Sequence, residues 1–596
     1  MNRFVKSMLA LSVTSAMTMS MVNAATYKVI DKGVASVKYT YAQHANNAGD
    51  MVLSGTNVYN FPVQFQYLTE NDFISIVNYA FVNQFVEHEL EPIEDYDALV
   101  AGNPTPNDLA WAVLWLTTKN GNYLYQEVEG TVVMLNSGDT SEEIPIFDVP
   151  FEGEDSPTRS TYDVVKGITS TSWIYGTASS PYLPEEFVNS NGDTVTYWGS
   201  DFSSRGFYSP DRGASVYSII PPSEQNSDPT KNYGGVSGIL DASETQIVVG
   251  FMSTEMNPNI QENLESETDS NGCNNPDVLD DVPKNICAQT YRDDGNTSAY
   301  QVRAFQATIS ASGETLTENL GLLVTPHEDD PRSYESYAQA VNDEGVVVGY
   351  SHGWVDEKET DPSTNQGRSL YAVLFKDGKV TSFAKDHNTD FDSRAYDINN
   401  AGIATGHVTK AINGKLRTKF YYIDTTNPDE MEMVFPTDFF DSSSSTARAI
   451  NESGFIVGEG EVETHTDNSS NPRRTHAFIY DINNDVFTDV NDLLTCANPY
   501  SIIEARDINE DNVISASAIY KVQRRDATGE LMVDDKGDPL MEDVVRAVTL
   551  EPMPDDGVVC TPEEEGKVVR QGASLGWLSL FTLFVLGVSR RFRKSN

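Results

Sequence analysis

Residues 338–351 read AQAVNDEGVVVGYS, and this stretch decides the fold because the chain repeats it. The shared pattern is a small or polar start, an apolar–Asn pair, two polar residues, Gly, three mostly apolar residues and a final Gly. Its later copies are residues 394–407 (RAYDINNAGIATGH), 447–459 (ARAINESGFIVGE) and 505–518 (ARDINEDNVISASA). The last copy has Asn512 and Ala516 where the glycines would fall. A period of roughly 52 to 58 residues suits a four-stranded unit.

Each copy has the chemistry of a β-hairpin. One strand ends at the apolar–Asn pair, Asn starts a type I turn through its side chain, and Gly takes the left-handed conformation before the chain returns. The second Gly lets the returning strand approach its neighbour closely. Degenerate copies occur at residues 45–56, 165–177 and 238–251. The sequence therefore predicts seven hairpins, at Asn46, Ile168, Leu240, Asn342, Asn399, Asn451 and Asn509.

Seven such units predict an all-β repeat protein, a β-propeller-like ring of about seven blades that protects its sheet edges. Six or eight blades are close alternatives. An open β-solenoid is the runner-up, although units of this length are long for one coil. Further strands are expected at residues 61–67 and 110–115, and a long surface insertion at 257–297.

His476-Ala477-Phe478 carries a family resemblance. The chain resembles uncharacterised bacterial exoproteins with HAF-type extracellular repeats, whose unit is a Leu-Gly strand, an Ala-x-x-Ile-Asn-x-x-Gly-x-x-x-Gly hairpin and then His-Ala-Phe. Leu320-Gly321, residues 338–349 and Tyr371-Ala372 match one unit, and residues 394–406 and 447–458 match two more hairpins. The resemblance covers about residues 300–550, and it supplies no catalytic residues.

The N-terminus has the features of a signal peptide. Arg3 and Lys6 precede an uncharged run at residues 8–22, and small residues end it at Ala24. We expect signal peptidase to cleave between Ala24 and Ala25. A short membrane anchor is the alternative, but the run is only weakly apolar.

The C-terminus contains a second sorting signal. Gly572, Ala573 and Ser574 precede the apolar residues 575–589 (LGWLSLFTLFVLGVS) and a cluster of arginines. This tail resembles the GlyGly-CTERM signal of Gram-negative bacteria, with Gly-Ala in place of Gly-Gly. The resemblance implies a transient inner-membrane helix with a cytoplasmic C-terminus, cleavage by a rhombosortase-type protease, and export through the type II secretion machinery to the cell surface or medium. A permanent tail anchor is the alternative.

The expected organisation therefore has five parts. They are a signal peptide at 1–24, degenerate N-terminal repeats with an acidic insertion at 25–299, regular repeats at 300–551, a linker at 552–571 and the sorting signal at 572–596. The formal charge of −49, from 89 acidic and 40 basic residues, argues against nucleic-acid binding.

Four cysteines fit an oxidising compartment. Four cysteines allow three pairings. Local pairs, Cys273 with Cys287 and Cys496 with Cys560, are preferred because no CxxC spacing indicates a metal or redox site.

The remaining motifs give little chemistry. Asp481, Asn483 and Asp485 resemble the start of a calcium-binding EF-hand loop, but Val486 replaces its glycine and the loop lies where a hairpin turn is expected. The eight histidines form no close ligand pair, and no nucleophile elbow or phosphate-binding loop is present. We therefore predict no catalytic residue, cofactor or metal, with calcium as a weak possibility.

These observations predict an exported or surface β-repeat protein that is a non-enzymatic binding module of unknown ligand. A secreted hydrolase or lyase acting on polysaccharide or protein is the alternative, with its site in the central channel or the N-terminal half. A cell-envelope structural protein is the third interpretation.

Overall fold

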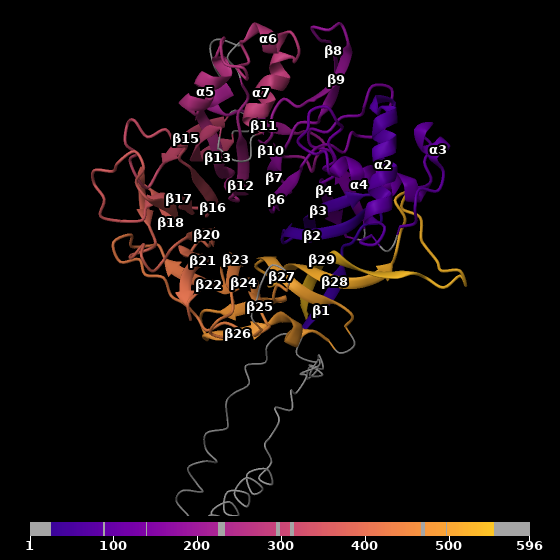
Figure 1. Cartoon of the computed structure of the whole chain (residues 1–596). Coiled ribbons are helices and arrows are strands. Elements are labelled where there is room, and N and C mark those ends of the chain that lie inside the picture. The colour runs from indigo at the N-terminus through magenta and orange to yellow at the C-terminus, as the bar shows by residue number, and fades with distance from the viewer. Residues whose placement is uncertain are drawn as a thin grey trace, which may run out of the picture.

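Seven small antiparallel sheets are arranged in a ring (Figure 1), and residues of all seven line one central cavity, the channel. The structure is a computed structural model and describes residues 26–87, 90–138, 140–224, 233–293, 299–309, 315–465, 471–495 and 498–553. Neighbouring sheets contact one another all the way round, including the last and the first. The prediction of an all-β, seven-bladed β-propeller is therefore confirmed, and the open solenoid and the other blade counts are excluded.

Each blade contributes its strands in order from the channel outward, and the inner strand is the first strand of a sequence hairpin. Blades 1 to 3 are β2 (Val37–Ala45), β3 (Asp50–Val58), β4 (Val132–Ser137) and β5 (Thr140–Ile144); β6 (Val164–Ile168), β7 (Ile174–Ala178), β10 (Arg205–Ser209) and β11 (Tyr217–Ile219); and β12 (Ser237–Ala242), β13 (Ile247–Met256), β14 (Tyr300–Ile309) and β15 (Thr315–Gly321).

The other blades come from the more regular repeats. Blades 4 to 7 are β16 (Ser336–Val341), β17 (Val347–Trp354), β18 (Arg368–Lys376) and β19 (Lys379–Ser382); β20 (Ser393–Ile398), β21 (Ile403–Ile412) and β22 (Lys415–Asp424); β23 (Ser445–Ile450), β24 (Phe455–Glu461), β25 (Thr475–Asp481) and β26 (Val486–Asp489); and β27 (Ser501–Ile508), β28 (Ile514–Gln523), β29 (Met541–Met553) and β1 (Thr26–Asp31). In blade 5 a bridge between Tyr422 and Val434 stands at the place of the fourth strand.

The hairpin turns have the predicted chemistry. Gly345, Gly402 and Gly454 take left-handed backbone conformations with φ between 77° and 81°. In the seventh copy Asn512 takes the same conformation with φ of 60°, which Asn tolerates better than most residues. The Asn for Gly exchange therefore leaves the turn intact.

The ring is closed by the N-terminal strand. β1 pairs with β29 along its whole length, from Thr26 opposite Met553 to Asp31 opposite Val548. The first described strand thus becomes the outer strand of the last blade. Both ends of the described chain leave from this one sheet.

Apolar clusters lie between the blades. Each of the seven blade interfaces has its own buried cluster, including the one between blades 7 and 1. Because every blade shares its core with two neighbours, the stability of each blade depends on closure of the ring.

A helical insertion lies between β3 and β4, and it corrects two strand predictions. It contains α2 (Glu70–Asn83), α3 (Tyr96–Val100) and α4 (Pro106–Thr117), so residues 110–115 are helical. Thr105 caps α4, Pro106 occupies its first turn, and Trp111 is fully buried against α2. Residues 61–67 form no strand and contain only the short 3₁₀ helix η1 (Phe65–Tyr67).

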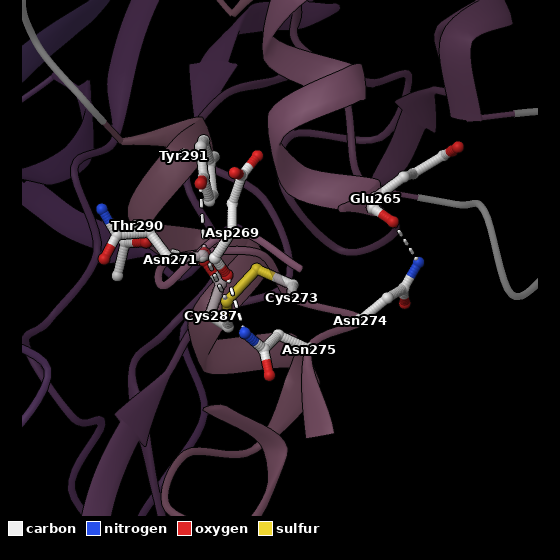
Figure 2. Close-up of a disulfide and its surroundings, with 9 residues drawn as sticks. All are labelled: Glu265, Asp269, Asn271, Cys273, Asn274, Asn275, Cys287, Thr290 and Tyr291. Carbon is white, nitrogen blue, oxygen red and sulfur yellow. Dashed lines mark hydrogen bonds between the residues drawn. A yellow bond between two sulfur atoms is a disulfide. The ribbon is translucent and has the colours of Figure 1, made fainter. Parts of the chain in front are cut away.

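The second insertion, between β13 and β14, is more ordered than the sequence indicated. It contains α5 (Pro258–Glu265), α6 (Pro276–Leu279) and α7 (Lys284–Arg292), and α7 contacts the separate hairpin of β8 (Leu183–Val188) and β9 (Thr194–Gly199). Figure 2 shows the disulfide between Cys273 and Cys287 that links the loop after α5 to α7. One of the two preferred cysteine pairs is thereby confirmed. Two further 3₁₀ helices are η2 (Pro222–Glu224) and η4 (Val490–Leu493).

Candidate functional site

The inner strand of every blade contains a one-residue β-bulge next to the channel. Each bulge is visible as a shift in register against the second strand, as between Ala338 and Ala340, where Gln339 is the extra residue. A bulge redirects a side chain. All seven bulged residues line one cavity of about 480 Å³ at the centre of the ring. They are Gln43, Lys166, Leu240, Gln339, Tyr396, Arg448 and Arg506.

The bulge explains the second glycine of the repeat. A Cβ on Gly349, Gly406 or Gly458 would lie 2.0 Å from a backbone carbonyl oxygen of the bulged inner strand. The scaffold around the bulge therefore repeats, while the bulged residue itself varies among amide, amine, alkyl, phenol and guanidinium groups. This separation of a constant frame from a variable inward position is typical of a binding site built on repeats.

The turn asparagines connect neighbouring blades as well as shaping their own hairpins. Asn342 accepts the backbone N–H of Val346 through Oδ1 (2.9 Å) and donates from Nδ2 to the carbonyl of Asn399 in the next blade (3.2 Å). Asn399 and Asn451 make the same contact to the blade that follows each of them (3.1 Å for both). The Asn of the opening motif is thus a structural link between blades, which its sequence context did not reveal.

The residues that follow these turn positions form one mouth of the channel. Each accepts the backbone N–H of its counterpart in the preceding blade, as Asp343 does from Glu244 (3.0 Å) and Glu452 does from Asn400 (2.8 Å). We call this ring the acidic mouth; its members are Glu244, Asp343, Asn400, Glu452 and Glu510.

Three aspartates directly follow bulged residues. Asp241, Asp397 and Asp507 each accept the backbone N–H of a residue in the next blade, at 2.8, 2.7 and 3.2 Å. Burial, and then the negative charges of Asp241 and Asp507, raise the pKa of Asp397 to about 8. Burial also raises the pKa of Asp241. His44 lies 3.8 Å from Asp507. These three carboxyl groups therefore join blade 3 to blade 4, blade 5 to blade 6 and blade 7 to blade 1 within the channel.

The basic side chains of the channel gather in blades 2, 6 and 7. Glu459 binds Arg448 through Nε (3.0 Å) and Nη2 (2.6 Å), and Glu504 lies 3.0 Å from Nε of Arg506. Lys166 is accessible to solvent in the channel yet surrounded by protein. Burial, together with Arg506 and Arg448, lowers its pKa to about 8. Within the described residues, Lys166 makes no hydrogen bond or ion pair.

Other predicted site residues stand apart from this channel. Ala24, Ala25, Gly572, Ala573, Ser574, Cys496 and Cys560 lie outside the described residues. Asp481, Asn483 and Asp485 form the turn between β25 and β26, where Asp481 accepts two backbone N–H groups. In the part of the chain that the structure describes, no group of three or more His, Cys, Asp or Glu residues could hold a metal ion.

The histidine of the family triplet is part of the blade. Nδ1 of His476 lies 2.7 Å from Asp489, on the neighbouring strand of blade 6. Within the described residues, no helix is both long and apolar enough to cross a membrane.

The sequence did not identify the bulged residues as site residues. Their signal was a variable position between the repeated Ala and the Ile-Asn pair.

The fold and channel define a seven-bladed β-propeller with a polar central cavity. The chain belongs to the family described as "Protein of unknown function (DUF3466)", which matches residues 3–591. A search of curated proteins gives no match.

Among solved structures, the chain is similar to a puromycin-hydrolyzing peptidase of Mycobacterium tuberculosis, with 9% identity and a TM-score of 0.34. The match covers 88% of this chain and 56% of the peptidase chain.

Proposed function

We propose that the protein is an exported β-propeller that binds a small ligand in its central channel without transforming it. The observation that carries the proposal is the convergence of all seven bulged residues on one cavity. Polar groups that converge in a concave site of this size are typical of ligand binding. A propeller held together by its blades alone needs no such variable set of inward side chains.

The acidic groups of the channel favour binding over catalysis. Asp241, Asp397 and Asp507 are each occupied by a backbone N–H of the next blade, and these contacts hold the ring together. A general acid or base needs a carboxyl group that reaches the substrate. The same aspartates, with His44 beside Asp507, are the observation that favours a hydrolase or lyase as the second candidate.

Export is supported by the sequences of the two chain ends. The expected cleavage between Ala24 and Ala25 leaves Thr26 as the start of β1, so the mature chain keeps the strand that closes the ring. Met553, at the end of β29, lies opposite Thr26. Mass spectrometry of culture medium and membranes tests export; an intact C-terminus found in the inner membrane alone would overturn it.

A channel-filling substitution tests the binding function. Leu240→Trp places an indole in the cavity at a bulged position that is already apolar. We expect at least one compound in a panel of saccharides, amino acids and organic acids to raise the Tm of the wild-type protein and leave that of Leu240→Trp unchanged. Ligand binding at about 100 times Kd stabilises a protein by about 2.7 kcal/mol, so the shift is measurable by scanning fluorimetry.

Val486→Trp is the matched control, because Val486 is 45% exposed at the start of β26, the outer strand of blade 6. It should respond to ligand as the wild type does. Equal stabilisation of Leu240→Trp by every active compound would refute a channel site. Release of a product from the stabilising compound, detected by mass spectrometry, would instead establish the hydrolase or lyase.

A further inference from the structure

The charged side chains of the channel are sorted by depth. At the level of the bulges, Lys166, Arg448 and Arg506 are basic and none of the seven residues is acidic. This is unexpected in a chain whose acidic residues outnumber the basic ones 89 to 40. At the acidic mouth the order is reversed, because Glu244, Asp343, Glu452 and Glu510 carry carboxylates there.

The backbone fixes the order of these two levels along the channel. Blades 6 and 7 each supply both, since Arg448 precedes Glu452, and Arg506 precedes Glu510, by four residues. Arg448 and Arg506 lie within β23 and β27, whereas Glu452 and Glu510 lie in the turns that follow these strands. Asp507 directly follows Arg506 and so lies between the levels. The channel therefore has positive charge at depth and negative charge toward the mouth.

In the part of the chain that the structure describes, several donors of the basic level make no hydrogen bond or ion pair. Arg448 uses Nε and Nη2 to bind Glu459, and Arg506 uses Nε against Glu504. Within the described ranges, no bond is found for Nη1 of Arg448, either Nη atom of Arg506 or Nζ of Lys166. At this level the three cations face the carboxylates of Glu459 and Glu504, and Asp507 lies directly beside Arg506 in the same cavity. Guanidinium and ammonium donors of this kind bind oxyanions well.

A simple anion is nevertheless a poor ligand for this channel. It has to pass the carboxylates of the mouth in a chain of formal charge −49, and like charges in a cleft oppose entry. A simple cation passes the mouth but meets Lys166 and the two arginines at depth. A molecule that carries both charges satisfies both levels.

We propose that the channel ligand is a zwitterion, whose oxyanion binds Lys166, Arg448 and Arg506 and whose cationic group points toward the acidic mouth. The inference rests on the proposed binding function and names its ligand class. Amino acids and other small molecules with one carboxylate and one ammonium group have this chemistry.

Three probes of similar size test it: 4-aminobutyrate, butyrate, which lacks the ammonium group, and butylamine, which lacks the carboxylate. Binding to the purified mature protein is measured by calorimetry or by ligand-observed NMR. We expect 4-aminobutyrate to bind at least about tenfold more tightly than either single-charge probe, because each lost charged contact costs a factor of about ten or more. Equal binding of butyrate would overturn the proposal.

Two substitutions assign the ends of the ligand. Lys166→Met should weaken 4-aminobutyrate by about tenfold or more and leave butylamine unaffected, because it removes one anion donor without breaking a contact. Lys166→Arg should restore binding, and Lys38→Met, which removes a cation paired with Glu542 at 2.7 Å, is the control. Glu452→Gln keeps an oxygen to accept the N–H of Asn400 and should narrow the preference for 4-aminobutyrate over butyrate.

The outcomes separate this inference from the function on which it depends. If a neutral compound binds and Leu240→Trp blocks it, while none of the charged probes binds, the channel function stands and the zwitterion proposal fails. If 4-aminobutyrate binds equally well to Leu240→Trp, its site lies elsewhere and the channel function fails. Unchanged affinity of Lys166→Met for 4-aminobutyrate contradicts the assigned anion donors.

Discussion

Removing residues 26–31 is expected to prevent formation of a stable, soluble propeller. This change deletes β1, so β29 loses its six-residue partner and exposes an open sheet edge. It also removes Tyr27, which is 3% exposed, from the apolar cluster between blades 6 and 7. About five backbone hydrogen bonds at about 1 kcal/mol each, with about 2 kcal/mol from burying Tyr27, approach the whole stability of an ordinary domain.

Recovery of soluble protein and its Tm measure the effect, beside a control that lacks only Ala25. The control should equal the mature protein, since pairing begins at Thr26. A synthetic peptide of residues 26–31, added during refolding, should recover part of the soluble fraction. A truncated chain that stays soluble and melts within about two degrees of the control would show that closure by β1 is dispensable.

The number of blades could be predicted because it depends on local chemistry. Each hairpin is specified within about a dozen residues by its turn chemistry and a flanking apolar run, and the structure keeps all seven. Four copies combine an Asn with a left-handed Gly, whereas Ser172, Gln246 and Asn512 take the left-handed position in blades 2, 3 and 7. Even the irregular seventh copy retains its turn, because Asn512 adopts the conformation that Gly adopts elsewhere.

Pairing that is distant in sequence could not be predicted in this way. Nothing in the TYKVID sequence of residues 26–31 identifies β29 as its partner more than five hundred residues later. The strand predicted at residues 110–115 was a different kind of error, because the sequence contained the start signal of the helix Pro106–Thr117. Thr105, Pro106 and Asp108 give the cap, first turn and early acid of a helix, and Trp111 and Trp115 share one face.

The channel site was missed because a bulge is a property of two strands together. In sequence, Gln339 and Arg448 occupy unremarkable positions between apolar residues. Their inward direction follows only from the register between β16 and β17 and between β23 and β24. The sequence did mark the requirement indirectly in the regular copies, since the glycine that opposes the bulge in blades 4 to 6 was recognised as a place of close backbone approach.

Gly458→Ala is expected to destabilise the protein by at least about 3 kcal/mol, because the new methyl group meets backbone that cannot rotate away. Its Cβ would lie 2.0 Å from the carbonyl oxygen of Thr446, on the bulged strand that carries Arg448. The free energy of unfolding in urea measures the effect. Gly378→Ala is the control: its φ of 70° strains a side chain, but nothing lies within 4 Å, so it should cost only about 1 kcal/mol.

The seventh blade supplies the reverse experiment, because Ala516 occupies the glycine position opposite Ala505. Ala516→Gly should cost no more than about 1 kcal/mol, as an added glycine in a strand does.

A loss of stability below about 1 kcal/mol for Gly458→Ala would mean that the bulge in β23 can relax. Relaxation into regular pairing withdraws Arg448 from the channel. The Gly458→Ala variant should then remain folded but bind 4-aminobutyrate more weakly. Stability and binding depend on the same bulge, and Gly458→Ala must disturb at least one of them.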